Sequence, residues 1–62
     1  MQKYTEYCTC FYSSDNNEVI FFDEIEDKII GKQKVTCKQE ADNVMRIWQD
    51  SAPEGAICQI LV

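Results

Sequence analysis

The chain has 62 residues, four cysteines, no histidine and a net charge of −5 at pH 7. A chain of this length has room for one small core, because it buries only about 60% of the surface that its unfolded form exposes. Its hydrophobic content of 45% excludes a disordered protein. Its negative charge disfavours direct binding to nucleic acid or to an anionic membrane. We therefore expect a single folded domain spanning residues 1–62.

The first ten residues, MQKYTEYCTC, lack the apolar segment of a secretory signal peptide. The apolar runs of the sequence are also too short to span a bilayer. We therefore expect a cytoplasmic protein that does not act at a membrane. In that reducing compartment its cysteines are expected to be free thiols.

The first half of the chain predicts a β-hairpin. Residues 3–12 are rich in β-branched and aromatic side chains and contain neither glycine nor proline, which is typical of a strand. SSDNN, residues 13–17, has the composition of a turn. A second strand is predicted over residues 18–25, where the unbroken apolar run from Val19 to Phe22 indicates burial on both faces.

The segment that follows is the least defined by pattern, and residues 24–31 fit a strand, a turn or a helix. We favour a third strand within residues 28–37, because Ile29, Val35 and Cys37 fall on one face. Lysines occupy the alternate positions, as is typical of a strand with a wet face or a wet edge.

An amphipathic helix is predicted over residues 38–51, because apolar residues recur there at helical spacing. We expect it to bury Val44, Met45 and Trp48. Thr36 and Gln39 fit a capping box at its start. Pro53 and Gly55 are expected to end the helix and reverse the chain.

A last strand is predicted over residues 56–62, AICQILV, and its apolar character is typical of a strand inside a sheet rather than at an edge. The expected fold is therefore α+β: a three- to four-stranded, largely antiparallel sheet with one amphipathic helix packed on one face, in the order β-β-β-α-β. One arrangement places the last strand beside the first, with the helix in the crossover connection.

The cysteines are interpreted mainly as small core residues. Alternation along the strands allows all four to lie on the inner face beneath the helix, where free cysteine is commonly buried. A zinc site and a disulfide between neighbouring strands remain alternatives. Cys8 and Cys10 are poorly spaced for zinc, because residues two apart on a strand are about 6.5 Å apart. A catalytic cysteine is disfavoured, since the chain contains no histidine to act as a base.

A single helix can shield only one face of the sheet, so the other face is expected to expose large apolar side chains. Such a patch implies a partner, and a second copy of the chain is the simplest one. The candidate interface residues are Tyr7, Phe11, Phe22, Ile57 and Leu61. Phe21 replaces Phe22 if the second strand faces the other way. A strongly curled sheet that buries these residues itself is the alternative.

An acidic cluster follows the second predicted strand and contains Asp23, Glu24, Glu26 and Asp27. A solvated turn is the simplest interpretation. The spacing lacks the pattern of a calcium loop. A surface that mimics nucleic acid phosphates is the second interpretation.

These patterns predict a small non-enzymatic protein-interaction module, a homodimer that acts by binding another, unidentified protein. The first alternative is an acidic inhibitor that occupies the nucleic-acid groove of a nuclease or polymerase, as small phage proteins do. The second is a small structural zinc domain. No catalytic, cofactor-binding or metal-binding residue is predicted.

Overall fold

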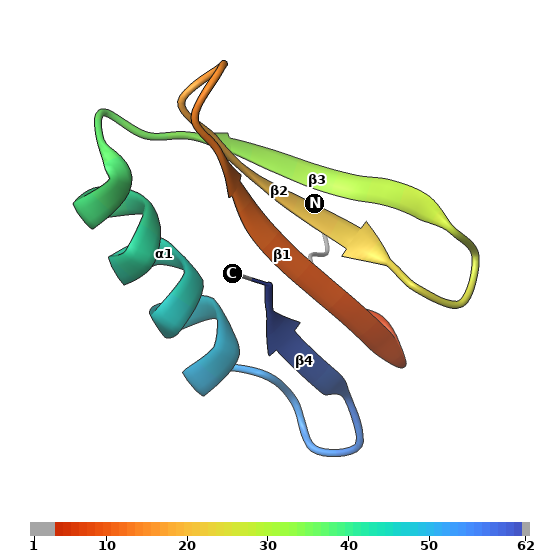
Figure 1. Ribbon diagram of the computed structural model, residues 1–62. Helices are drawn as coiled ribbons and strands as arrows, with labels where there is room; N and C mark the ends of the chain where they lie inside the picture. Colours follow the sequence, from red (N-terminus) through yellow and green to blue (C-terminus); the bar gives the residue numbers. More distant parts are fainter. Residues whose placement is uncertain (1–3, 62) are drawn as a thin grey trace.

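The computed structural model describes residues 4–61. Five elements follow one another along the chain: β1 (Tyr7–Ser13), β2 (Glu18–Asp23), β3 (Lys28–Lys34), α1 (Lys38–Asp50) and β4 (Ile57–Ile60). The strands form one mixed sheet in the order β3-β2-β1-β4, and α1 lies along one of its faces (Figure 1). The predicted α+β class and the order β-β-β-α-β are confirmed.

β1 and β2 form the predicted antiparallel hairpin, with Cys10 opposite Phe21. The turn between them ends at Asn17, which adopts a left-handed conformation with φ 51°; asparagine tolerates this conformation better than most residues. The Tyr12 hydroxyl donates a hydrogen bond of 2.8 Å to the Asn17 side chain. The turn chemistry of the sequence therefore operates as expected.

β1 begins at Tyr7, so the prediction that it starts at residue 3 is wrong for the described residues 4–6; Lys3 itself lies outside them. Tyr4 leaves the sheet and stacks on Trp48 of α1, with ring centroids 5.8 Å apart. Its hydroxyl donates a hydrogen bond of 2.7 Å to the Trp48 carbonyl. The contact with the helix replaces strand pairing for this segment.

β2 ends at Asp23, two residues before the predicted end. The Asp23 carboxylate accepts hydrogen bonds from the backbone N–H groups of Ile25 (2.9 Å) and Glu26 (3.3 Å), which turns the chain. Asp27 then adopts φ 58° and completes the reversal. Residues 24–27 are therefore a turn, and β3 begins directly after it.

β3 contains a β-bulge that the sequence analysis missed. Phe21 lies opposite Gly31, whereas the next residue, Phe22, lies opposite Ile29, so that Ile30 is the extra residue. The bulge places Ile29 on the face opposite to Val35, which is buried. The prediction that these two residues share a face is therefore wrong.

The predicted helix is confirmed almost to the residue, but its start differs in detail. β3 ends at Lys34, and Cys37 is the N-cap of α1 rather than a strand residue. The Glu40 carboxylate accepts hydrogen bonds from both the backbone N–H (3.1 Å) and the hydroxyl (3.2 Å) of Thr36. Glu40 thus takes the capping role that the sequence analysis assigned to Gln39.

The helix ends at Asp50, and the connection to β4 passes through Pro53 and Gly55. Gly55 has φ 92°, a conformation that glycine adopts without strain, and it reverses the chain as predicted. Within residues 4–61, no helix is both long enough and apolar enough to cross a membrane.

β4 runs parallel to β1 and forms an edge of the sheet, so the prediction of an interior strand is wrong. The Ile57 N–H donates to the carbonyl of Glu6, just before β1, and the Leu61 N–H donates to that of Cys10 in β1. This pattern directs the backbone polar groups of Cys58 away from β1. The Gln49 side chain of α1 donates a hydrogen bond of 2.9 Å to the Cys58 carbonyl. The helix thereby supplies a hydrogen-bond partner for one outward-facing carbonyl of β4. The apolar sequence of β4 had not indicated that this strand lies at an edge. Val62 lies outside the described residues.

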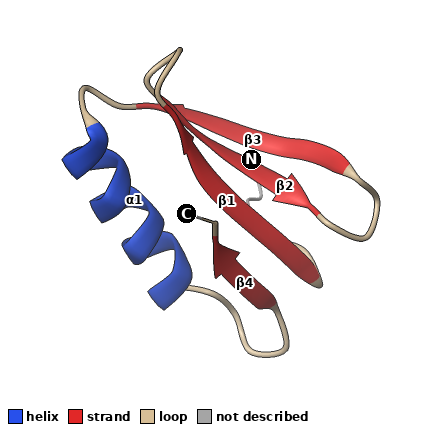
Figure 2. Ribbon diagram, in the orientation of Figure 1, coloured by secondary structure: helices blue, strands red, loops and turns tan. Residues whose placement is uncertain are grey.

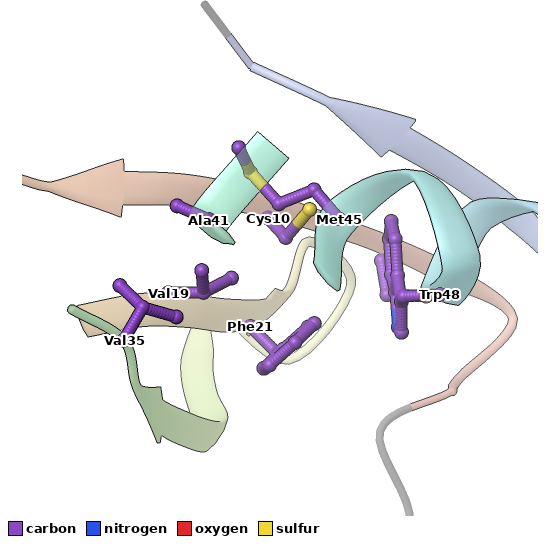
Figure 3. Close-up of a cluster of buried hydrophobic side chains, with 8 residues drawn as sticks. Cys10, Val19, Phe21, Val35, Ala41, Met45 and Trp48 are labelled. Carbon is purple, nitrogen blue, oxygen red and sulfur yellow. The ribbon is translucent and has the colours of Figure 1, made fainter. Parts of the chain in front are cut away.

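The core lies between α1 and the sheet (Figure 2), where α1 packs against β1, β2 and β4. Figure 3 shows the side chains that meet there, with Met45 and Trp48 reaching down from the helix. The buried apolar residues are Cys8, Cys10, Val19, Phe21, Val35, Ala41, Met45 and Trp48. The predicted burial of Met45 and Trp48 is confirmed, and that of Val44 is confirmed in part, because Val44 is half-buried and packs against this core.

We predict that Trp48→Ala lowers the free energy of unfolding by about 3–5 kcal/mol, because it removes a nearly buried ring that contacts Tyr4 and Phe21. Urea denaturation followed by circular dichroism measures the loss. Trp48→Phe is the matched control, since it keeps an aromatic ring and should lose less. Native tryptophan emission typical of a fully hydrated indole would contradict the burial on which this prediction depends.

Candidate functional site

Within residues 4–61, α1 covers one face of the sheet and no other element covers the opposite face, which we call the open face. Its members follow from the strand register, because alternate residues of a strand point to opposite faces. Val19 and Phe21 are fully buried on the helix side, which places Ile20 and Phe22 on the open face. The ambiguity of the second strand is thereby resolved, and Phe22 rather than Phe21 belongs to the candidate site.

Four candidate interface residues predicted from the sequence lie on the open face by register: Tyr7, Phe11, Phe22 and Ile57. Leu61 lies one residue beyond β4 and lines a hollow with Met45 of α1 and Ile60, so its assignment to this face stays a prediction. With those added by the structure, the apolar residues of the open face are Tyr7, Phe11, Ile20, Phe22, Ile29 and Ile57. Sequence reasoning missed Ile29, because only the bulge in β3 brings it opposite Phe22. If the strand is assumed to alternate regularly, without the bulge, Ile29 is assigned to the helix side rather than to the open face.

Three of these side chains are substantially exposed: Tyr7 36%, Ile29 53% and Ile57 52%. Phe11, Ile20 and Phe22 are half-buried by their neighbours. The sheet therefore does not curl enough to hide this set. Large apolar side chains gathered on one surface are the signature of a contact site rather than of ordinary scatter.

Near the centre of the open face, the buried Thr9 hydroxyl is hydrogen-bonded within the chain. Thr9 is only 2% exposed although no helix covers it, and its Cα partners are Phe22 and Gln59. Its hydroxyl donates a hydrogen bond of 2.9 Å to the carboxylate of Glu24. The Thr9 hydroxyl is thus satisfied within the chain. The Glu24 carboxylate, Gln59 beside Thr9 and Lys32 beside Ile20 add polar groups to the open face.

Both edges of the sheet are poorly suited to strand pairing with another chain. β3 carries Lys28, Lys32 and Lys34, and lysines at an edge oppose the approach of a second copy of the same strand. On β4, the outward-facing carbonyl of Cys58 already accepts a hydrogen bond from the Gln49 side chain of α1. Contact through the open face is therefore favoured over contact through an edge.

The acidic cluster is only partly a surface feature. Asp23 is 3% exposed, and its carboxylate is turned into the β2–β3 turn. Glu24 accepts the bond from Thr9, and Glu26 pairs with Lys28 at 3.5 Å. At least one of the four carboxylates is thus unavailable for imitating a phosphate, and two others have partners within the chain.

Three cysteines converge on the helix side of the sheet. Cys8 and Cys58 are Cα partners on β1 and β4, and their Sγ atoms are 3.4 Å apart. Cys10 lies two residues farther along β1 and is fully buried. The prediction of core cysteines is confirmed for Cys8 and Cys10, and Cys58 is half-buried. It is wrong for Cys37, which is exposed at the start of α1 because β3 has already ended.

The environments of the thiols set their chemistry. Burial raises the pKa of Cys10 to about 12, and the neighbouring Cys8 and Cys58 add to this effect. Burial, followed by the hydrogen bond with Cys8, also raises the pKa of Cys58 to about 12. Such thiols are poor nucleophiles at neutral pH. Within residues 4–61, no group of three or more His, Cys, Asp or Glu side chains is arranged to hold a metal ion.

Cys37 has the opposite environment. The backbone N–H of Glu40 lowers the pKa of the Cys37 thiol most, and the Thr36 hydroxyl, 4.0 Å from its Sγ atom, lowers it further. The Sγ atom nevertheless makes no full N-cap hydrogen bond. Cys37 is therefore the most reactive thiol expected from the structure, but it stands apart from the other three.

A shallow cavity of about 280 Å³ lies between α1 and the sheet. Its lining residues are Tyr4, Phe21, Gln33, Val44, Ile47, Trp48 and Ser51. The Tyr4 hydroxyl is already bonded to the helix backbone, and the described lining residues include no carboxylate or amine.

No known protein family, curated protein or solved structure matches this chain. The function is therefore inferred from the geometry of the described residues, above all from the exposed apolar side chains of the open face.

We predict that iodoacetamide at neutral pH alkylates Cys37 first, at least about tenfold faster than the other cysteines, because it is exposed and its pKa is lowered. Raising the pH should speed this reaction, since more thiolate forms as the pH rises towards the lowered pKa of Cys37. Cys10 and Cys58 should stay protonated, because their pKa values are about 12. Intact mass and peptide mapping measure the rates.

Cys37→Ser is the control for this selectivity and should remove the fast phase without changing the slow one. Equal labelling of Cys58 and Cys37 in the folded protein would contradict the assignment.

Proposed function

We propose that this protein is a small, non-enzymatic interaction domain that self-associates through its open face, with a second copy of the chain as the occupant. The observation that carries the proposal is the distribution of exposed apolar side chains. Among the described residues, three of the six large apolar side chains that are most exposed lie on this one face: Tyr7, Ile29 and Ile57. The half-buried Phe11, Ile20 and Phe22 lie beside them. Burial of such surface is the main driving force of association.

The size of the open face suits a modest dimer. Four strands about 4.8 Å apart give a face roughly 19 Å wide. A standard interface takes about 800 Å² from each partner, which is about a fifth of the accessible surface of 4243 Å². The open face approaches this area only if nearly all of it is used, so we expect a dissociation constant of about 1–100 μM.

The charges favour one orientation of the two copies. A two-fold axis parallel to the strands places β3 of one copy over β4 of the other, so that Lys32 and Lys34 do not meet their own counterparts. The central β1 and β2 strands then cover each other, which brings the apolar centres of the two faces together. Sheets stacked in this way cross at about 30°, as their twist requires.

A role in binding a different protein stays a prediction beyond this proposal, with the dimer as the unit that binds. The acidic-inhibitor alternative has less support, because Asp23 is buried and Glu24 is bonded to Thr9. The zinc alternative has less support, because within residues 4–61 no three His, Cys, Asp or Glu side chains are placed to hold a metal ion.

We predict that sedimentation equilibrium between about 1 and 300 μM shows an average mass rising from 7.2 kDa towards twice that value. A mass that stays at 7.2 kDa over the whole range would contradict the proposal. The open face would then belong to a partner other than a second copy.

Two substitutions test which surface is used. Ile57→Glu places a charge on the open face and should raise the dissociation constant at least about tenfold, because association would then desolvate the carboxylate. Ile47→Glu is the matched control: it makes the same change at a 66% exposed position on α1 and should leave association unchanged. Thermal unfolding of both variants confirms that the monomers remain folded.

A further inference from the structure

We propose that Cys8 and Cys58 form an intramolecular disulfide when the chain meets a low-molecular-weight disulfide oxidant, and that this bond fixes the edge strand β4 to β1. The proposal is independent of self-association through the open face. It concerns the helix side of the sheet, where the two sulfur atoms already touch at 3.4 Å.

The backbone geometry is suitable for the bond. Cys8 and Cys58 are direct partners in the parallel pairing of β1 with β4. Neighbouring strands lie about 4.8 Å apart, which falls within the range of about 4.4–6.8 Å between the Cα atoms of a disulfide. Only a small side-chain rotation is needed to bring the sulfur atoms from 3.4 Å to bonding distance.

The competing pairings fit less well. Cys8 and Cys10 lie on the same strand, with Cα atoms about 6.5 Å apart, near the upper limit for a disulfide. The β4 partner of Cys10 is Ile60, so Cys10 meets Cys58 only diagonally. Cys37 is exposed beyond the end of β3 and takes no part in the buried cluster.

The bond would act where the sheet is weakest. β4 has four residues, pairs with a single neighbouring strand and lies at an edge. Cys8 and Cys58 are separated by 50 positions in the sequence, so their bond closes nearly the whole domain into one loop. Closing a loop of that length removes much of the entropy of the unfolded chain.

The chemistry is a thiol–disulfide exchange in two steps. The Cys58 thiolate attacks one sulfur of oxidised glutathione, which releases one glutathione thiolate and leaves a mixed disulfide on Cys58. The Cys8 thiolate then attacks the Cys58 sulfur and releases the second glutathione. Two protein thiols are oxidised by two electrons, one oxidised glutathione is reduced to two glutathione thiols, and these take up the two protons.

Access decides when this reaction occurs. Cys8 is fully buried and Cys58 half-buried, so of these two thiols the oxidant can reach only Cys58 in the folded chain. Burial also keeps the Cys58 thiol protonated at neutral pH, which slows the first step. The bond should therefore form readily during refolding and slowly in the native protein.

The test uses the full chain with Cys37→Ser, which removes the exposed thiol, refolded in a buffer of reduced and oxidised glutathione. We expect a monomeric product lighter by two hydrogen atoms, with a peptide map that joins Cys8 to Cys58. Its midpoint of thermal unfolding should exceed that of the reduced form by more than about 10 °C. Dithiothreitol should reverse the mass change and the gain in stability.

Two further variants assign the bond. Cys58→Ser added to Cys37→Ser should abolish both the mass change and the rise in midpoint, whereas Cys10→Ala in the same background should keep both. A peptide map joining Cys8 to Cys10, no oxidation during refolding, or an oxidised form no more stable than the reduced one would each overturn the proposal. The map of the Cys37→Ser protein decides the pairing even if Cys10→Ala does not fold.

Discussion

The structure depends on the contact of Trp48 with two other aromatic rings. Tyr4 stacks on Trp48 at 5.8 Å and Phe21 packs against it at 5.5 Å, so a single helical residue joins the N-terminal segment, the helix and the centre of the sheet. Because residues 4–61 form a single helix, this contact also decides which face of the sheet is covered. The open face follows from the same choice: once α1 packs on the side of Val19 and Phe21, the alternate residues of every strand are left without a cover.

Where side-chain period alone decides, the sequence was sufficient. The helical spacing that includes Met45 and Trp48 located α1 to within one residue, and the hairpin turn ended at an asparagine with the expected left-handed backbone. Prediction failed where a distant contact decides. The position of β4 at an edge, the bulge at Ile30 and the exposure of Cys37 depend on which segments meet, and local pattern does not carry that information.

The two faces of the sheet carry side chains of different size on β1. On the helix side, small thiols at Cys8 and Cys10 leave room for Met45 and Trp48, so the core packs without long aliphatic chains from β1. On the open face, β1 carries Tyr7 and Phe11 instead, and these project from the sheet. Alternation of small and large residues along β1 thus distinguishes the face that is packed under α1 from the face that no element of the described chain covers.

Two consecutive isoleucines, Ile29 and Ile30, allow β3 to gain or lose one residue without changing the side chain that lies opposite Phe22. A strand that lost Ile30 would form a regular ladder and still place Ile29 opposite Phe22 and Lys28 opposite Asp23. A local slip by one residue would put Ile30 in the place of Ile29, with the same side chain opposite Phe22. Elsewhere in the sheet a slip of this size would exchange the inner and outer residues of a strand. Insertions and deletions during the divergence of this protein should therefore be tolerated more readily in β3 than in β1 or β2.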